Sequence, residues 1–244
     1  MRYFYSKNID TENGTIVIDG EEYRHVIKVN RLREGDTCII INGEGLRAQV
    51  TLDRITKKDV TCRIEQYEVH ERPIEPRITL CCAISRKGVF ATVVEKAVEL
   101  GVDVIVPFIS GRSMVKIHDD ESFVAKHTLI VREALKQCHR LFEPCVHVPI
   151  RDVDAIPCGR VPGGIVKRFL LEPTNGMMPR DAVAMSSAGN VNEIFFAVGP
   201  EGGFSSEEQQ CFARNGFENV YFPHTIMRTD TAVVAMLSVL RFGR

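Results

Sequence analysis

The sequence predicts a mixed α/β chain in which a small β domain precedes a larger domain built on a parallel sheet. Short runs of β-branched residues separated by turns fill residues 1–71, a pattern typical of an antiparallel β-barrel or sandwich. From residue 77 onward, nearly continuous apolar strands alternate with amphipathic helices, as in α/β domains. The segment 72–76 contains two prolines and no apolar pattern, which predicts a linker between domains at 1–71 and 77–244.

The first domain is expected to be almost entirely β. Its helical periodicity is confined to the stretch around Tyr23 to Asn30. Turn sequences such as REGD and NGEG separate its apolar runs, and these runs predict antiparallel strands at 15–18, 37–41, 46–52 and 60–64.

The second domain is expected to alternate strands and helices to its end. Strands are predicted at 78–84, 102–109, 165–172, 193–199 and 219–222, and helices at 89–100 and 122–139. Ser205 and Glu208 form a capping box that opens a helix ending near Gly216. A final helix from about Thr231 is apolar on nearly every face, so it must be buried in the core or at a subunit interface. The polar stretch 173–192 shows no pattern and is expected to be a loop.

Composition places the chain among ordinary soluble proteins. Of its 244 residues, 44% are hydrophobic and 26% are charged. No apolar run is long enough to span a membrane, and the first residues lack the apolar core of a signal peptide. A cytoplasmic protein without a membrane partner is therefore expected. The eight cysteines have no metal-ligand spacing, which predicts buried thiols and no metal site.

The distribution of charge suggests a nucleic-acid partner even though the net charge is −1. A near-neutral total by itself argues against one, because contact with phosphates needs clustered cations. The segment 112–140 nevertheless holds six basic residues, namely Arg112, Lys116, Lys126, Arg132, Lys136 and Arg140. The last three recur every four residues, which predicts a basic stripe along one face of a helix.

A glycine-rich turn is the strongest candidate for a ligand site. Gly199, Gly202 and Gly203 lie between a predicted buried strand and the capped helix. Ligands of open α/β sheets bind at the carboxyl ends of strands, and glycines let a ligand approach the backbone closely. The spacing matches neither a dinucleotide fingerprint nor a Walker loop. A tight turn without a ligand remains the alternative reading of this run.

A second turn, 223–231, also joins a short strand to a helix. Arg228 lies there among hydroxyl side chains, where it can face an anion or a developing negative charge. A solvated helix cap is the alternative.

The whole chain resembles the ribosomal small subunit methyltransferase E family, the 16S rRNA uracil-N3 methyltransferases of the SPOUT superfamily. The resemblance follows a fixed order of short motifs: ELGV at 99–102, GRSMVK at 111–116, REALKQCHR at 132–140, FLLEP at 169–173, GPEGGFSSEE at 199–208 and IMRTDTA at 226–232. Each motif alone is weak, whereas all of them in this order are highly specific.

The resemblance implies a PUA-like β-barrel that binds RNA, followed by a SPOUT methyltransferase domain with a deep trefoil knot that acts as a homodimer. It implies S-adenosyl-L-methionine as cofactor, lying across three loops. These loops contain Leu171, Glu172, Gly199, Pro200, Glu201, Gly202, Gly203, Phe222, Ile226, Met227 and Arg228. Phe222 and Pro223 depart from the Leu-Gly of the family pattern, and Pro223 has no N–H to donate to the cofactor.

The activity implied is methylation of N3 of one uridine in the 16S rRNA of the 30S subunit. Arg228 is the candidate catalytic residue, because a cation beside the uracil carbonyl oxygens stabilises the anion left when N3 loses its proton. Glu201 is a second candidate, as proton acceptor or as holder of a loop amide. The residues expected to contact RNA are Arg24, His25, Arg31, Arg33, Arg112, Arg132, Lys136 and Arg140. Alternatives are a methyltransferase for another RNA base or a 2′-hydroxyl, and a non-catalytic RNA-binding relative.

Overall fold

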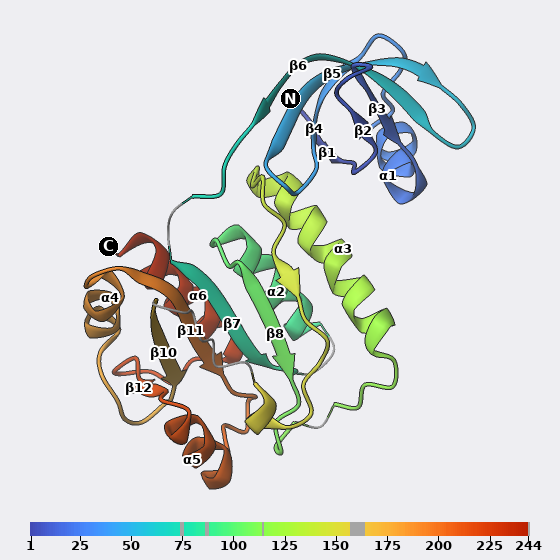
Figure 1. The fold of residues 1–244 in the computed structure, drawn as a ribbon. Coiled ribbons are helices and arrows are strands. Elements are labelled where there is room, and N and C mark those ends of the chain that lie inside the picture. The colour runs from blue at the N-terminus through green and yellow to red at the C-terminus, as the bar shows by residue number, and fades with distance from the viewer. Residues whose placement is uncertain (74–75, 86–87, 114, 157–163, 244) are drawn as a thin grey trace. The chain divides into compact units, whose positions relative to one another are not determined.

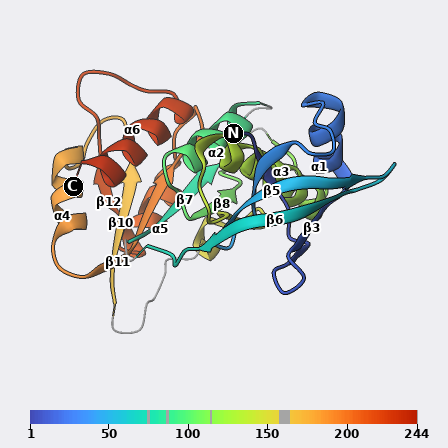
Figure 2. The same cartoon turned by 90° about the horizontal axis from the view of Figure 1, so that it is seen from above.

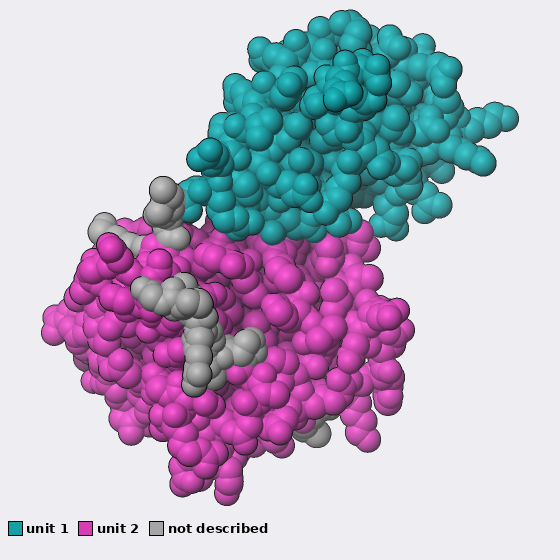
Figure 3. Space-filling view, in the orientation of Figure 1, with its two compact units in different colours: residues 1–73, 132–143 teal, residues 74–131, 144–244 magenta. Residues whose placement is uncertain are grey.

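The strands of the chain form two separate sheets, one in each of two units (Figures 1 and 3). The computed structural model describes residues 1–73, 76–85, 88–113, 115–156 and 164–243. One unit consists of residues 1–73 together with 132–143, and the other of residues 74–131 and 144–244. The first unit thus includes residues 132–143, from the middle of the chain. The division predicted from the sequence places these residues in the second domain instead.

The first unit is built on a six-stranded sheet in the order β1-β4-β5-β6-β3-β2. Its strands are β1 Tyr3–Tyr5, β2 Ile9–Asp10, β3 Thr15–Ile18, β4 Thr37–Ile41, β5 Leu46–Ile55 and β6 Val60–Val69. The predictions for 15–18 and 37–41 are confirmed at both ends. Every pair is antiparallel except β1 and β4, which run parallel, so the expectation of purely antiparallel pairing is wrong at that edge.

Alternation of side chains along the strands builds the core of this unit. In β5, buried and partly exposed residues alternate from Leu46 to Leu52, as the two faces of a pleated strand require. The short helix α1 Gly20–Arg24 continues into a π-helical turn at His25–Val29 (Figure 2), and Val26 of that turn joins the core.

The second unit is built on a six-stranded sheet in the order β12-β10-β11-β7-β8-β9. Its strands are β7 Arg77–Ala83, β8 Val104–Phe108, β9 Cys145–Val146, β10 Ile165–Leu171, β11 Val191–Val198 and β12 Glu218–Val220. Every neighbouring pair is parallel, which confirms the predicted parallel sheet. All six strands therefore end at the same edge.

Helices connect most of these strands, and a final helix follows β12. They are α2 Val89–Glu99, α3 Asp120–Cys138, α4 Pro179–Ser187, α5 Ser206–Arg214 and α6 Thr229–Phe242, with a 3₁₀ turn at Val153–Ala155. The final helix α6 packs against α2, α4 and β11, so its apolar surface is largely buried in the core. Among the residues that the structure describes, none of the helices has both the length and the hydropathy that crossing a membrane would require.

The helix α4 lies within the stretch expected to be a loop, so that prediction is wrong. The N-cap residue is Met178, whose backbone N–H donates to the carboxylate of Asp181 at 3.3 Å. Methionine is not a preferred N-cap residue, so the local signals for this helix start are Pro179 at its first position and Asp181 two residues later. Packing of α4 against α6, β10 and β11 supplies the stabilisation that local propensity lacks.

The predicted capping box of α5 is confirmed, and its glutamate does more than cap the helix. The Ser205 hydroxyl accepts from the Glu208 N–H at 3.2 Å, and Glu208 Oε2 accepts from the Ser205 N–H at 2.8 Å. The same carboxylate, which is buried, accepts from the Ser110 hydroxyl at 3.1 Å and from the Gly111 N–H at 2.9 Å. Glu208 therefore joins the start of α5 to the loop that follows β8.

Glu208→Ala is expected to lower the free energy of unfolding by about 3 kcal/mol, because it removes a cap and leaves buried donors unpaired. Denaturant unfolding measures the change. Glu207→Ala, one residue earlier and exposed, is the control and should change the free energy of unfolding by less than about 0.5 kcal/mol. Equal losses in the two variants would show that Glu208 does not join the two segments.

Candidate functional site

Three loops at the carboxyl edge of the parallel sheet enclose a hollow of about 250 Å³. They follow β10, β11 and β12, and we call this space the glycine-turn hollow. The structure brings into its lining ten of the residues singled out for the cofactor, namely Leu171, Glu172, Gly199, Pro200, Glu201, Gly203, Phe222, Ile226, Met227 and Arg228. The remaining one, Gly202, faces an adjoining hollow.

The glycines have identifiable geometric roles in the turn 199–203. Gly203 has φ +68° and its N–H donates to the Pro200 carbonyl at 2.9 Å, so the chain turns through the left-handed region that favours glycine. A Cβ on Gly199 would lie 3.1 Å from the Phe204 ring, which itself stacks on the buried Phe108. A side chain at position 199 would therefore have to displace the Phe204 ring, and one at position 203 would strain the backbone.

Side chains from two other segments hold this turn. The Thr229 hydroxyl, at the first turn of α6, donates to the Gly199 carbonyl at 3.0 Å. Arg112 Nη1, from the loop after β8, donates to the Gly202 carbonyl at 2.8 Å. The sequence identified Arg112 only as an RNA contact, whereas the structure also gives it a role in positioning the turn.

Glu172 places a carboxylate inside the glycine-turn hollow. Only 8% of the residue is exposed. Its Oε2 accepts from Gln209 Nε2 at 3.1 Å, while Oε1 has no hydrogen-bond partner among the described residues. Burial raises the pKa of this carboxyl group above its usual value. An unpaired buried acceptor is costly, so the hollow is suited to a ligand that brings a donor or a positive charge.

Glu201 and Arg228 bring opposite charges to the same hollow. Both residues are exposed, and within the described ranges neither side chain has a hydrogen bond or ion pair. Arg228 stands at the N-cap of α6, and Glu201 follows Pro200 in the glycine-rich turn. Both charges are therefore available to a ligand.

A second hollow adjoins the first. It has a volume of about 300 Å³ and is lined by Ile84, Ser85, Arg112, Ser113, Val115, Pro200, Glu201 and Gly202; we call it the Arg112 hollow. Pro200 and Glu201 line both spaces. Glu201 thus stands where a molecule in one hollow can meet a molecule in the other.

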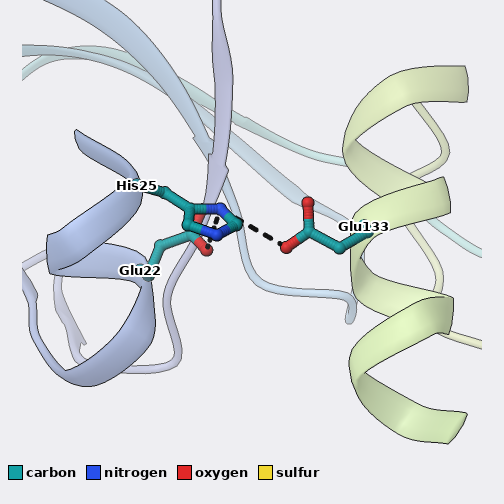
Figure 4. Close-up of side chains that lie close together, drawn as sticks. All are labelled: Glu22, His25 and Glu133. Carbon is teal, nitrogen blue, oxygen red and sulfur yellow. Dashed lines mark ion pairs between the residues drawn. The ribbon is translucent and has the colours of Figure 1, made fainter. Parts of the chain in front are cut away.

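The expected basic stripe on α3 needs correction at Lys136. This side chain is buried, and its ammonium group lies 2.8 Å from both Glu22 Oε2 and Glu133 Oε1. The neighbouring His25 lies 3.5 Å from Glu133 (Figure 4). Since the charge of Lys136 is already neutralised within the first unit, it is not free to contact phosphate. The same ammonium group accounts for the cluster of Glu22, His25 and Glu133 without a metal.

Arg132 is likewise engaged inside the first unit. Its Nε lies 2.9 Å from Glu143 Oε1, and its guanidinium group lies 4.5 Å from the centre of the Tyr5 ring. The Tyr5 hydroxyl donates to the same glutamate, and burial raises the Tyr5 pKa. Of the other expected RNA contacts, Arg24, Arg31 and Arg33 are exposed, whereas His25 and Arg140 are partly buried.

Some lining residues were not identified from the sequence. Val198, Val220 and Ala232 contribute an apolar wall, and Thr229 contributes a hydroxyl. The sequence places Thr229 near the start of a helix. No local sequence pattern predicts that its hydroxyl donates to the Gly199 carbonyl in the glycine-rich turn.

Comparison with known proteins agrees with this architecture. Residues 71–241 match the family model of an RNA methyltransferase domain, and residues 18–65 match that of an RNA methyltransferase PUA domain. Ribosomal RNA small subunit methyltransferase E of Aquifex aeolicus is 30% identical over 98% of this chain and 99% of its own length. The enzyme of the same name from Bacillus subtilis is 25% identical over 99% of this chain and 96% of its own length.

Two solved structures share the fold. A methyltransferase of Legionella pneumophila in complex with S-adenosylmethionine superposes with a TM-score of 0.87 at 28% identity, covering 99% of this chain and 97% of its own. Ribosomal RNA small subunit methyltransferase E of Neisseria gonorrhoeae, also bound to S-adenosylmethionine, gives 0.83 at 26% identity, with 98% and 96% covered. The chain described here therefore belongs to the ribosomal RNA small subunit methyltransferase E family of RNA methyltransferases.

Proposed function

We propose that this protein transfers a methyl group from S-adenosyl-L-methionine to N3 of one uridine in the 16S rRNA of the small ribosomal subunit, giving N3-methyluridine. The observation that carries the proposal is the glycine-turn hollow, in which a buried carboxylate with a free oxygen, an exposed carboxylate and an exposed arginine meet at the edge of the sheet. Relatives of that name match the chain over nearly its whole length.

The residues of this hollow fit the proposed cofactor. Leu171, Val198 and Phe222 offer apolar walls to an adenosine group, and the free Oε1 of Glu172 is an acceptor for its hydroxyl or amino donors. Pro223, the residue that departs from the family pattern, is not among the lining residues that the structure describes. Its missing N–H therefore removes no donor from the described lining of this hollow. When bound, the cofactor supplies a methyl group made electrophilic by the adjoining sulfonium.

The chain's own groups then have to prepare the uracil. N3 must lose its proton before it can accept a methyl group, and the negative charge spreads to the two neighbouring carbonyl oxygens. Arg228 provides a cation for those oxygens. Glu201, which lines both adjoining hollows, provides a carboxylate to accept the proton. Thr229 and Arg112 hold the turn that carries Glu201, so its position is set before the substrate arrives.

The proposal includes the organisation of the whole protein. Residues 1–71 form a PUA-like domain that offers Arg24, Arg31 and Arg33 to RNA, and the knotted domain at 77–244 works as a homodimer in the cytoplasm. The homodimer is what the family resemblance implies for this chain.

The direct test is transfer of a labelled methyl group from S-adenosylmethionine to small ribosomal subunits that lack the modification, followed by nucleoside analysis. We expect N3-methyluridine. A different methylated nucleoside would keep the methyltransferase and reject the uracil-N3 assignment. Absence of transfer, with RNA binding intact, would instead favour a non-catalytic RNA-binding protein.

Glu172→Gln is expected to stabilise the protein while weakening cofactor binding. At neutral pH it removes a buried charge, so the free energy of unfolding should rise by about 1 kcal/mol. The gain should vanish below the usual pKa range of carboxyl groups, since Glu172 is then neutral in both the folded and the unfolded chain. Affinity for S-adenosylmethionine should fall roughly tenfold.

Denaturant unfolding between acidic and neutral pH and calorimetric titration with S-adenosylmethionine measure the two effects of Glu172→Gln. Unchanged affinity would remove Glu172 from the proposed cofactor site. A loss of stability at neutral pH would contradict the cost assigned to its burial.

Arg228→Ala is expected to reduce methyl transfer roughly 100-fold, because stabilisation of a developing anion is lost. The dissociation constant for S-adenosylmethionine should change much less. Single-turnover transfer and equilibrium binding separate the two quantities. Arg180→Ala is the control, since that side chain is also exposed and lies on α4, outside the hollow. Transfer at the normal rate by Arg228→Ala would exclude the catalytic role.

A further inference from the structure

A third hollow lies in the second unit, beyond the Arg112 hollow. Its volume is about 670 Å³, within the range of ligand sites. Its lining comes from the end of β7, the start of α2, the loop after β8 and the start of α3, and includes Ser85, Gly88, Phe90, Lys116, Ser122 and Lys126. We call it the Ser85 hollow. No step of the proposed function has yet used it.

Ser85 gives this hollow an unused hydrogen-bond donor. Only 5% of the residue is exposed, and its hydroxyl has no hydrogen-bond partner among the described residues. Buried polar groups in folded proteins are nearly always paired, so this hydroxyl is available to an atom that enters the hollow. Ser85 lines both the Ser85 hollow and the Arg112 hollow.

The start of α2 adds a positive electrostatic potential. Gly88 is the N-cap of this eleven-residue helix and has no side chain to cap it, and no acidic residue lies in the first turn. Gly88, Phe90 and Ala91 all line the hollow. The free N–H groups and the dipole of a helix start favour an anion.

Two lysines complete the surroundings. Lys116 and Lys126 are exposed and line the hollow, and within the described ranges neither is in an ion pair. The acidic residue among the lining residues is Asp119, and its carboxylate is engaged with the Ser122 N–H at 3.1 Å. Burial lowers the pKa of the adjoining His127, so it adds no charge at neutral pH. The balance of charge favours an anion.

The three hollows are linked by shared walls. Ile84, Ser85 and Val115 line both the Ser85 and the Arg112 hollows, while Pro200 and Glu201 line both the Arg112 and the glycine-turn hollows. A nucleotide whose base lies beside Glu201 can extend its backbone through the Arg112 hollow, which shares these three lining residues with the Ser85 hollow. The anion that such a chain brings is a phosphodiester.

We propose that the Ser85 hollow binds a backbone phosphate of the RNA strand next to the nucleotide to be methylated, through the Ser85 hydroxyl, the N–H groups at the start of α2, Lys116 and Lys126. The inference rests on the proposed function and adds a positioning site to it. A phosphate held there orients the strand without reading its sequence, and places the target base against the turn that carries Glu201.

Binding of a short, fluorescently labelled, uridine-containing single-stranded RNA at a series of salt concentrations tests the site. Lys116→Gln and Lys126→Gln should each weaken binding roughly fivefold and reduce the slope of log affinity against log salt by about 0.7, because one phosphate contact is lost. Ser85→Ala should weaken binding roughly threefold at every salt concentration and leave the slope unchanged, because it removes a neutral donor.

Lys96→Gln is the matched control, since it makes the same change of charge at the other end of α2, where the lysine is paired with Glu95 and Glu99. It should leave affinity and slope unchanged. Equal effects of Lys96→Gln and Lys126→Gln, an unaffected Ser85→Ala variant, or no binding of the RNA by the wild-type protein would each overturn the inference. Methyl transfer by the wild-type protein to small ribosomal subunits, measured in parallel, tests the proposed function separately, and thermal melting verifies that each variant is folded.

Discussion

The parallel direction of all six strands in the second sheet is the constraint on which the rest of this structure depends. Parallel strands need a crossover connection between them. Each connection therefore begins at the edge of the sheet where the carboxyl ends of the strands lie. The loops after β7, β8, β10, β11 and β12 therefore lie next to one another. Segments far apart in the sequence, from Ser85 to Arg228, line adjoining hollows for this reason, and no single motif could contain the site.

Proximity alone does not fix the conformation of these loops. Hydrogen bonds between the loops hold them in place. Glu208 joins the loop after β8 to the start of α5, Arg112 joins that loop to the glycine-rich turn, and Thr229 joins the turn to α6. Each bond uses a backbone carbonyl or N–H of a turn, and the one to Gly199 satisfies a carbonyl that is buried. The turn that carries Glu201 is thus held from two sides by elements that are themselves packed into the core.

Much of this could be predicted from the sequence where local rules decide the structure. Runs of β-branched and apolar residues bounded by turns located most strands, and the capping box located the start of α5. Local sequence patterns failed where contacts with residues far away in the sequence determine the structure. The spacing of Lys136 correctly placed it on one face of α3, but only contact with Glu22, 114 residues earlier, makes that face buried. Met178 gave no signal for the start of α4. The free oxygen of Glu172 could not be predicted either, because a motif can name a residue without showing which of its atoms lacks a partner.

The distribution of charge explains why a chain with a net charge of −1 is suited to the proposed reaction. A methyl donor that carries a sulfonium and an acceptor strand that carries phosphates have opposite electrostatic requirements, so one uniformly charged cleft would repel one of them. The structure separates the two. Two carboxylates, Glu172 and Glu201, line the glycine-turn hollow beside Arg228, the single cation among its described lining residues. Two lysines and a helix start line the Ser85 hollow beside Asp119, the one carboxylate in its described lining. The two charge patterns lie in separate spaces, on either side of the Arg112 hollow, rather than over the whole surface. Net charge therefore gives no indication of either.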